Sequence, residues 1–235
     1  SVLIDYLLQS ASEHDWQVQV ADLDKSAAEA RIAGHPRGEA IGLDAGDDGQ
    51  RDALIRDAAL VVSMLPAHMH PPVAEACIHF GTHFASASYV SPEIRALQEA
   101  AERSGVTLIN EMGVDPGIDH MSAMERLDEL RRSGATIRAF ETFTGGLVAP
   151  ESDNNPWRYK FTWNPRNVVL AGQGGVKFKH NGRYKYIPYH KLFSRYEMLS
   201  IPGYGEFEGY PNRDSLKYRH HYGHYEVGTI YRRTT

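Results

Sequence analysis

The chain has 235 residues, 42% of them hydrophobic, which is enough to bury one large core or one and a half. Since no apolar run approaches the roughly 20 residues that a bilayer-spanning helix needs, membrane spans are excluded. The net charge of −5, with both signs interspersed, lacks the basic surface of a nucleic-acid-binding protein. Its single cysteine, Cys77, excludes internal disulfides and multi-cysteine metal motifs, and predicts a reducing, cytoplasmic location.

Helix-like and strand-like segments alternate from residue 1 to about residue 146. The pattern predicts helices over 2–12, 26–33, 51–56 and 72–80, and strands over 17–23, 40–44, 60–65 and 82–86. Ser91 is the predicted N-cap of a helix over 92–104, which is followed by a strand over 106–110 and a helix over 118–133. Short apolar strands that alternate with helices predict an α/β fold with a doubly wound, Rossmann-type parallel sheet.

The composition changes after the glycine pair at 145–146, where Tyr, Trp, Asn, Pro and Gly become frequent. Strand candidates at 168–171, 184–188 and 229–232 predict an α+β domain with antiparallel pairing. We therefore assign residues 1–148 to a dinucleotide-binding domain and residues 149–235 to part of a second domain.

A dinucleotide-binding sheet normally begins with a strand and a Gly-rich turn, followed by a helix whose N-terminus binds the pyrophosphate. This chain begins with the helix-like segment 2–12, and a strand and such a turn do not precede it. If this segment is the first helix of the fold, the strand and turn would lie before residue 1. The sequence is therefore expected to be an internal part of a longer protein.

The run NEMGVDPGIDHM at 110–121 links a predicted strand to a predicted helix through a turn rich in Gly, Pro and Asp. Ligands bind at such turns in open α/β sheets. Two further segments are SYVSP at 88–92 and NPWRYKFTWNPR at 155–166. In this order the three segments resemble the saccharopine dehydrogenases, in particular the glutamate-forming branch, and the resemblance spans essentially the whole chain.

The resemblance implies an NAD- or NADP-dependent oxidoreductase that acts on CH–NH bonds. Such an enzyme interconverts saccharopine with glutamate and 2-aminoadipate semialdehyde, so the expected partners are a small amino-acid substrate and a second copy of the chain in a homodimer. The second domain would serve substrate binding and dimerisation. Two alternatives stay open: a sister imine reductase such as carboxynorspermidine dehydrogenase, and a non-catalytic fragment that lacks the nucleotide loop.

The resemblance also implies roles for particular residues. Ser88 and Tyr89 match positions that touch both cofactor and saccharopine, and Arg166 matches the substrate arginine. Asp115 matches a position against the substrate amine and the cofactor, where a carboxylate would stabilise the cation formed when the imine is protonated. Asp115 is therefore the expected catalytic residue, and the residue that acts as general acid is left open.

Asp22 closes the predicted second strand of the dinucleotide fold, where a carboxylate binds the adenosine ribose hydroxyls and repels a 2′-phosphate. This position favours NAD, although fungal members of the family use NADP; the alternative is a solvated strand-end aspartate. The other cofactor candidates follow later strands, partly by resemblance: Asp44, Ala45, Leu65, Ala87, Ser88, Val114, Asp115 and Pro116.

Weaker candidates have ordinary structural explanations. Arg158, Lys160 and Arg213 could bind substrate carboxylates, but surface ion pairs explain them equally well. Asp119 suits the dipole of a helix N-terminus, and His120 could be a buried, hydrogen-bonded histidine.

Two histidine groups, His68 with His70 and His220–His221 with His224, raise the question of a metal site. No nearby carboxylate–histidine set completes a zinc signature, so no metal site is predicted.

Overall fold

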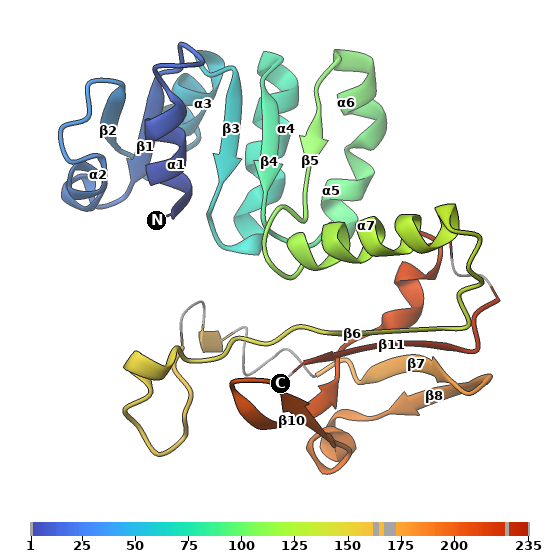
Figure 1. The fold of residues 1–235 in the computed structure, drawn as a ribbon. Helices are drawn as coiled ribbons and strands as arrows, with labels where there is room; N and C mark the ends of the chain where they lie inside the picture. The colour runs from blue at the N-terminus through green and yellow to red at the C-terminus, as the bar shows by residue number, and fades with distance from the viewer. Residues whose placement is uncertain (1, 162–164, 167–172, 224–225, 235) are drawn as a thin grey trace. The chain divides into compact units, whose positions relative to one another are not determined.

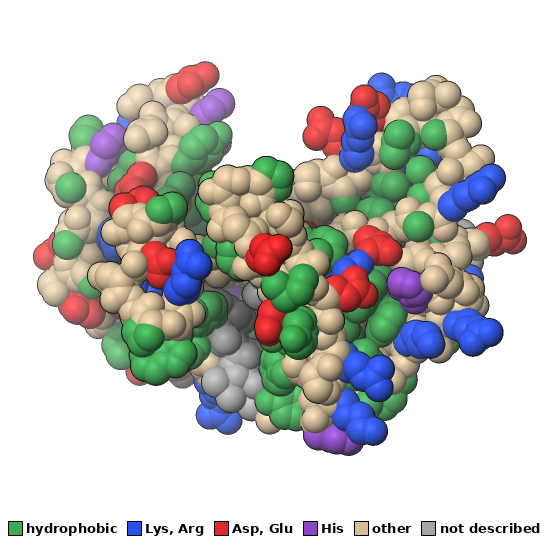
Figure 2. Space-filling view, turned by 60° about the horizontal axis from the view of Figure 1, so that its bottom comes forward, with side chains coloured by type: hydrophobic (Ala, Val, Ile, Leu, Met, Phe, Trp, Pro, Cys, Tyr) green, Lys and Arg blue, Asp and Glu red, His purple; other side chains and the backbone are tan. Residues whose placement is uncertain are grey.

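The computed structural model describes residues 2–161, 165–166, 173–223 and 226–234 (Figure 1). The chain divides into two compact units, Ser1–Gly117 and Ile118–Thr235. No helix in the described part of the chain is long and apolar enough to cross a membrane. Acidic, basic and hydrophobic side chains all reach the face that Figure 2 draws, in keeping with the interspersed charges of the sequence.

The first unit alternates parallel strands with helices, which confirms the predicted α/β class. Its strands are β1 (Val18–Asp22), β2 (Gly38–Gly42), β3 (Leu60–Ser63), β4 (His83–Ser86) and β5 (Leu108–Ile109). Its helices are α1 (Val2–Ser10), α2 (Lys25–Ile32), α3 (Asp48–Arg56), α4 (His70–Phe80), α5 (Pro92–Ala96) and α6 (Gln98–Ser104), with the 3₁₀ turn η1 (Ala67–Met69) before α4.

Hydrogen bonding groups the described strands of this unit into two parallel sheets (Figure 1). Strand β1 pairs with β2, so that Asp22 lies opposite Gly42, and β4 lies between β3 and β5. In the Rossmann order 3-2-1-4-5-6, one strand stands between the positions that β1 and β3 occupy here. The strand predicted before residue 1 would take that position, and it stays a prediction.

The core of the first unit lies where helices cover β3 and β4. Phe84, in the middle strand, is fully buried, and around it pack Val73 and Cys77 from α4 and Ile55 from α3. The Thr82 hydroxyl donates to the Ile55 carbonyl at 2.9 Å, which ties the start of β4 to the end of α3. This packing fixes the positions of the C-terminal ends of β3 and β4.

Helix boundaries follow side-chain caps. The Ser91 hydroxyl accepts a hydrogen bond from the Ile94 amide at 3.2 Å and Pro92 occupies the first helical position, as predicted. Asp24 and Asp47 cap α2 and α3 in the same way. The prediction of one helix over 92–104 was wrong, because two helices, α5 and α6, meet at Leu97.

The second unit is built on a mostly antiparallel sheet. Its elements are α7 (Ile118–Arg132), β6 (Ala139–Phe143), η2 (Pro150–Ser152), β7 (Val176–His180), β8 (Arg183–Ile187), η3 (Tyr189–Ser194), β9 (Glu197–Ile201), β10 (Gly205–Pro211), η4 (Ser215–Arg219) and β11 (Thr229–Thr234). The described strands follow the order β8-β7-β11-β10-β9, and β6 pairs with β11 in parallel. The predicted strands at 184–188 and 229–232 correspond to β8 and β11, whereas the strand predicted at 168–171 lies outside the described residues.

The sequence places the domain boundary after residue 148, whereas the compact units divide after Gly117. Strand β6 belongs to the second unit because it pairs with β11 from Ala139 to Phe143. Periodicity along the chain predicts α7, but it predicts neither β6 nor the sheet that β6 joins.

Candidate active site

Polar side chains gather where the parallel strands β3, β4 and β5 end. Ser63 and Ser86 are the last residues of β3 and β4, and both are buried. The Ser86 hydroxyl donates to Asn110 Oδ1 at 3.0 Å, which joins the end of β4 to the residue after β5. Since buried hydroxyls need partners, these bonds fix the geometry of the edge.

Ser88 lies two residues beyond β4 and is fixed by its backbone and its side chain. Its carbonyl accepts from the Glu111 amide at 3.0 Å, and its hydroxyl lies 2.8 Å from His70 Nε2. The other ring nitrogen of His70 lies 2.9 Å from the Ser63 hydroxyl.

His70 is only 3% exposed, and its ring meets Phe84 edge-on. Burial, with the positive charge of His68 as a smaller cause, lowers the pKa of His70. The imidazole is therefore neutral near pH 7, with one donor and one acceptor nitrogen.

Tyr89 and Asp115 meet directly, although 26 positions separate them in the sequence. The Tyr89 hydroxyl donates to Asp115 Oδ1 at 2.7 Å, and both side chains are partly exposed. The structure thus brings together Ser88, Tyr89 and Asp115, the three residues of the first unit predicted to touch substrate.

A closed turn presents Asp115. The Gly113 amide donates to the Pro116 carbonyl at 2.9 Å, and a Cβ at Gly117, whose φ is +151°, would lie 2.1 Å from the Gly113 carbonyl oxygen. Glycine is therefore required at position 117. On the other side, a Cβ at Gly113 would lie 3.3 Å from the Ala87 side chain, so the turn packs on the segment that follows β4.

The residues predicted to contact the adenosine half of the cofactor lie at the end of β1 and just after β2. Of these, Asp22 and Asp44 are exposed. Asp22 Oδ1 accepts from the Asp24 amide at 2.9 Å, and Asp44 Oδ1 accepts from the Gly46 amide at 2.9 Å. Both carboxylates therefore organise their own turns, which is a structural role that needs no ligand. Ala45 is half-buried beside Asp44.

The remaining cofactor candidates follow β3, β4 and β5. Leu65 packs against the hydrophobic core, and Ala87 contacts the turn at Gly113. Val114 is 67% exposed, whereas Pro116 is buried. Val114 is thus the one of these four side chains that mainly faces solvent.

The predicted basic residues belong to the second unit. Arg166 is exposed, and Arg158 pairs with Asp153 at 2.8 Å, so Arg158 has the surface ion pair that its structural explanation predicts. Lys160 is half-buried. Arg213 is also half-buried and has a φ of +48°, a conformation that residues other than glycine seldom adopt and that often marks functional loops.

Asp119 and His120 take part in a buried cluster of the second unit. Asp119 Oδ2 accepts from Arg232 Nη2 at 2.9 Å, and Tyr218 stacks on the Arg232 guanidinium at 4.5 Å. His120 Nδ1 is hydrogen-bonded to the Tyr222 hydroxyl. These contacts hold α7 to η4 and β11, so both residues have structural roles.

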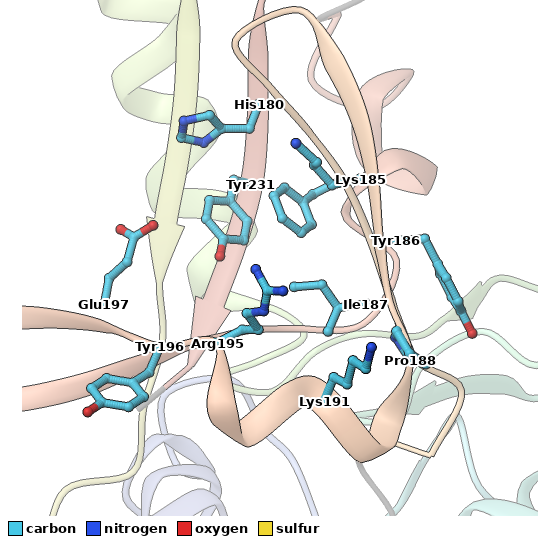
Figure 3. A pocket seen from close by; sticks show the side chains of 11 residues that line it. His180, Lys185, Tyr186, Ile187, Pro188, Lys191, Arg195, Tyr196, Glu197 and Tyr231 are labelled. Atoms are coloured by element: carbon cyan, nitrogen blue, oxygen red, sulfur yellow. The ribbon is translucent and has the colours of Figure 1, made fainter.

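A pocket of about 500 Å³ also lies in the second unit, between β7, β8, η3 and β11 (Figure 3). Basic and aromatic side chains dominate its wall: His180, Lys185, Lys191 and Arg195 with Phe178, Tyr186, Tyr196 and Tyr231. In Figure 3 the Tyr186 ring points away from the labelled Arg195 and Ile187. None of the predicted site residues lines this pocket.

His70 was not predicted as a site residue, because His68 and His70 were considered only as possible metal ligands. Its position did carry a signal, since it begins the helix that follows a strand ending in Ser63. Its contact with Ser88, 18 positions later, could not be read from spacing.

Comparison with known proteins decides the family. A model described as the saccharopine dehydrogenase NADP binding domain matches residues 1–109, and one described as the saccharopine dehydrogenase C-terminal domain matches residues 113–235. The chain belongs to the saccharopine dehydrogenase family. This confirms the resemblance carried by the segments at 88–92, 110–121 and 155–166.

Similar proteins of known name support this family assignment. Saccharopine dehydrogenase (NADP(+), L-glutamate-forming) of Schizosaccharomyces pombe is 40% identical over 92% of this chain and 48% of its own length. The Saccharomyces cerevisiae protein of that name is 37% identical over 95% of this chain and 50% of its own length. Alpha-aminoadipic semialdehyde synthase of Arabidopsis thaliana is 38% identical over 96% of this chain and 21% of its own length. The chain thus spans about half the length of the two yeast dehydrogenases.

A solved structure confirms the fold. The apo, histidine-tagged saccharopine dehydrogenase (L-Glu forming) from Saccharomyces cerevisiae matches with a TM-score of 0.86 and 36% identity, over 98% of this chain and 51% of that chain. A nicotinamide nucleotide is the cofactor class of this family, as expected. The preference for NAD that we predicted from Asp22 gains no support. The matching domain model and the fungal relatives carry NADP, not NAD, in their names.

Proposed function

We propose that the protein containing this chain interconverts saccharopine with glutamate and 2-aminoadipate semialdehyde, a step of lysine metabolism. The observation that carries this proposal is the hydrogen bond between Tyr89 and Asp115 at 2.7 Å, beside Ser88, at the carboxyl end of a parallel sheet. Ligands bind at this edge in doubly wound folds, and the relatives' names supply the substrate.

Asp115 has the role of stabilising positive charge. Glutamate and the semialdehyde condense to an imine, and protonation of its nitrogen gives a cation that a nearby carboxylate stabilises. The Tyr89 hydroxyl fixes the orientation of that carboxylate. A bound nicotinamide nucleotide would supply the hydride for the imine carbon, or accept it in the reverse direction.

The strand ends of the first unit fit the adenosine half of such a nucleotide. We assign the ribose contact to the turn after β1, where Asp22 already accepts from Asp24 and Lys25 begins α2. The Lys25 stem lies 3.5 Å from the position of a Cβ on Gly42, beside the end of β2. The Lys25 ammonium lies 3.9 Å from the exposed Glu29 carboxylate, a surface pair that a 2′-phosphate could replace, so we propose NADP as the cofactor.

Replacing Lys25 by Ala tests this choice of cofactor. The dissociation constant of NADPH should rise by about tenfold, because a charge-assisted hydrogen bond is lost, while that of NADH should change little. Arg31→Ala, an exposed cation at the other end of α2, is the matched control. Equal effects of Lys25→Ala on both nucleotides would contradict the proposed phosphate contact.

Saccharopine has three carboxylates, so its site needs arginine or lysine side chains. We propose Arg166 as one of them, because it matches the family's substrate arginine, and Arg213 as a second because it is half-buried. A homodimer and a cytoplasmic location are also proposed, on the family resemblance and on the single cysteine.

Turnover in the full-length protein tests the proposed function. Saccharopine should reduce NADP, and the products should be glutamate and the semialdehyde. Nucleotide binding without saccharopine turnover would instead favour a sister imine reductase such as carboxynorspermidine dehydrogenase. Absence of nucleotide binding would overturn the proposal.

A further inference from the structure

A buried hydrogen-bonded chain runs from the end of β3 to the loop after β4. It consists of Ser63, His70 and Ser88, joined at 2.9 Å and 2.8 Å through the two ring nitrogens of His70. Ser63 and His70 are 4% and 3% exposed, whereas Ser88 is partly exposed. The chain therefore leads from the protein interior to one residue of the candidate active site.

The two serines at the ends of this hydrogen-bonded series differ in their hydrogen-bonding roles. A neutral imidazole donates from one nitrogen and accepts at the other. If the buried Ser63 hydroxyl donates to Nδ1, then Nε2–H donates to the Ser88 oxygen. The hydroxyl hydrogen of Ser88 is then not used by His70, and it is available to an acceptor outside the protein core.

The Ser88 backbone is held independently of its side chain. Its carbonyl accepts from the Glu111 amide at 3.0 Å, and its amide lies 3.3 Å from the Ser86 hydroxyl. With the backbone fixed, the remaining freedom of Ser88 is rotation of its side chain, which the contact with His70 restrains.

We propose that His70 is a positioning residue for Ser88: its Nε2–H holds the Ser88 oxygen and directs the hydroxyl hydrogen toward an acceptor oxygen of the bound ligand. This inference rests on the proposed function, in which Ser88 contacts substrate or nicotinamide nucleotide. The acceptor is a carboxylate or an amide carbonyl, since both are available on those ligands. His70 itself touches no ligand in this assignment.

Two replacements of His70 separate positioning from packing. Glutamine reaches as far as Nε2 and keeps a donor toward Ser88, whereas asparagine reaches only as far as Nδ1 and keeps a partner for Ser63 alone. In the full-length protein, His70→Asn should lower kcat/KM for saccharopine by about tenfold, the effect of one hydrogen bond, and His70→Gln should restore most of it. His79→Asn, on the exposed side of the same helix, is the control.

A double-mutant cycle tests whether His70 acts through Ser88. In a Ser88→Ala background, His70→Asn should have no further effect on kcat/KM, because the group that it positions is gone. Additive effects, or equal losses for His70→Asn and His70→Gln, would overturn the proposal. Thermal unfolding of each variant identifies losses that come only from instability.

Nitrogen NMR of the His70 ring gives a readout that does not need activity. The Nε2–H tautomer should dominate in the wild type, and Ser88→Ala should shift the Nε2 resonance while Ser63→Ala shifts the tautomer balance. An Nδ1–H tautomer, or a ring insensitive to Ser88→Ala, would overturn the inference. If the NMR result holds and saccharopine is not turned over, the proposed function fails and the His70–Ser88 coupling stands.

Discussion

Cys77 shows how burial sets the chemistry of one side chain. The thiol is fully buried in the core beside Phe84, and burial raises its pKa to about 12. Since the thiolate is the reactive form, Cys77 should not react with a thiol reagent at about pH 8 in the folded protein and should react fully in denaturant. Rapid labelling under native conditions would contradict this packing.

His70 links the candidate site to the pH dependence of stability. Its pKa is lowered below the ordinary value of about 6.5, so the unfolded chain binds more protons than the folded protein as the pH falls below that value. The favourable contribution of the neutral ring is therefore present above about pH 6.5 and is lost as the pH falls. His68 is the neighbouring titratable group that adds to this loss.

Urea unfolding of the wild type and His70→Gln from about pH 8 to about pH 5 measures this loss. The wild type should lose stability relative to His70→Gln as the pH falls. A difference that stays constant over this range would show that His70 titrates normally in the folded state.

Tyr89 tests the orientation of Asp115. Tyr89→Phe removes the hydroxyl that donates to Asp115 and should lower kcat/KM for saccharopine by about tenfold. The melting temperature should change little, as it should for the exposed control Tyr6→Phe. Unchanged turnover in Tyr89→Phe would mean that the hydrogen bond has no part in catalysis.

At the scale of elements, the cap of α5 offers a measurable test. Ser91→Ala removes the acceptor for the Ile94 amide and should lower the free energy of unfolding by about 1 kcal/mol. Ser91→Asn keeps a capping oxygen and should be close to the wild type. Equal destabilisation by Ala and Asn would mean that the hydroxyl acts through some other contact.

Local signals in the sequence predicted most elements of the first unit. Apolar alternation, capping residues and Ser91–Pro92 place its strands and helices within a few residues of those observed, because each signal acts over short distances. The exception is the helix predicted over 92–104, which is divided into α5 and α6 at Leu97. In the loop after β5, Glu111 adopts a φ of +62°. The contacts that shape this loop come from Ser86 and Ser88, which sequence spacing does not reveal.

At the scale of the whole molecule, one ion pair joins the first and last elements of the second unit. Asp119 of α7 and Arg232 of β11 are both buried at the side chain, 10% and 2% exposed, and 2.9 Å apart. Removing one member of such a pair leaves a buried charge, so Asp119→Ala should lower the free energy of unfolding by about 3–5 kcal/mol.

A second aspartate on the same helix provides the control. Asp128 pairs with Arg131 at 3.0 Å, but both side chains are substantially exposed. Asp128→Ala should therefore change stability by less than about 1 kcal/mol. Similar effects of the two substitutions in chemical unfolding would contradict the structural role of the Asp119–Arg232 pair.

Long-range pairing explains what the sequence left undetermined at this scale. The fold class and the site segments at 88–92 and 110–121 could be predicted, since motif and periodicity carry them. The assignment of β6 could not, because it depends on pairing with β11, far along the chain. The role of Asp119 depends on Arg232, 113 positions away, and was equally hidden.

The central claim is that saccharopine chemistry takes place beside Asp115. The most direct measurement compares the full-length wild type with Asp115→Asn for saccharopine-dependent reduction of NADP, together with NADPH binding. The wild type should turn over, and Asp115→Asn should bind NADPH nearly as well but lose roughly 100-fold in kcat, because the charge that stabilises the iminium is gone. Wild-type turnover in Asp115→Asn, or no turnover in the wild type, would contradict the account.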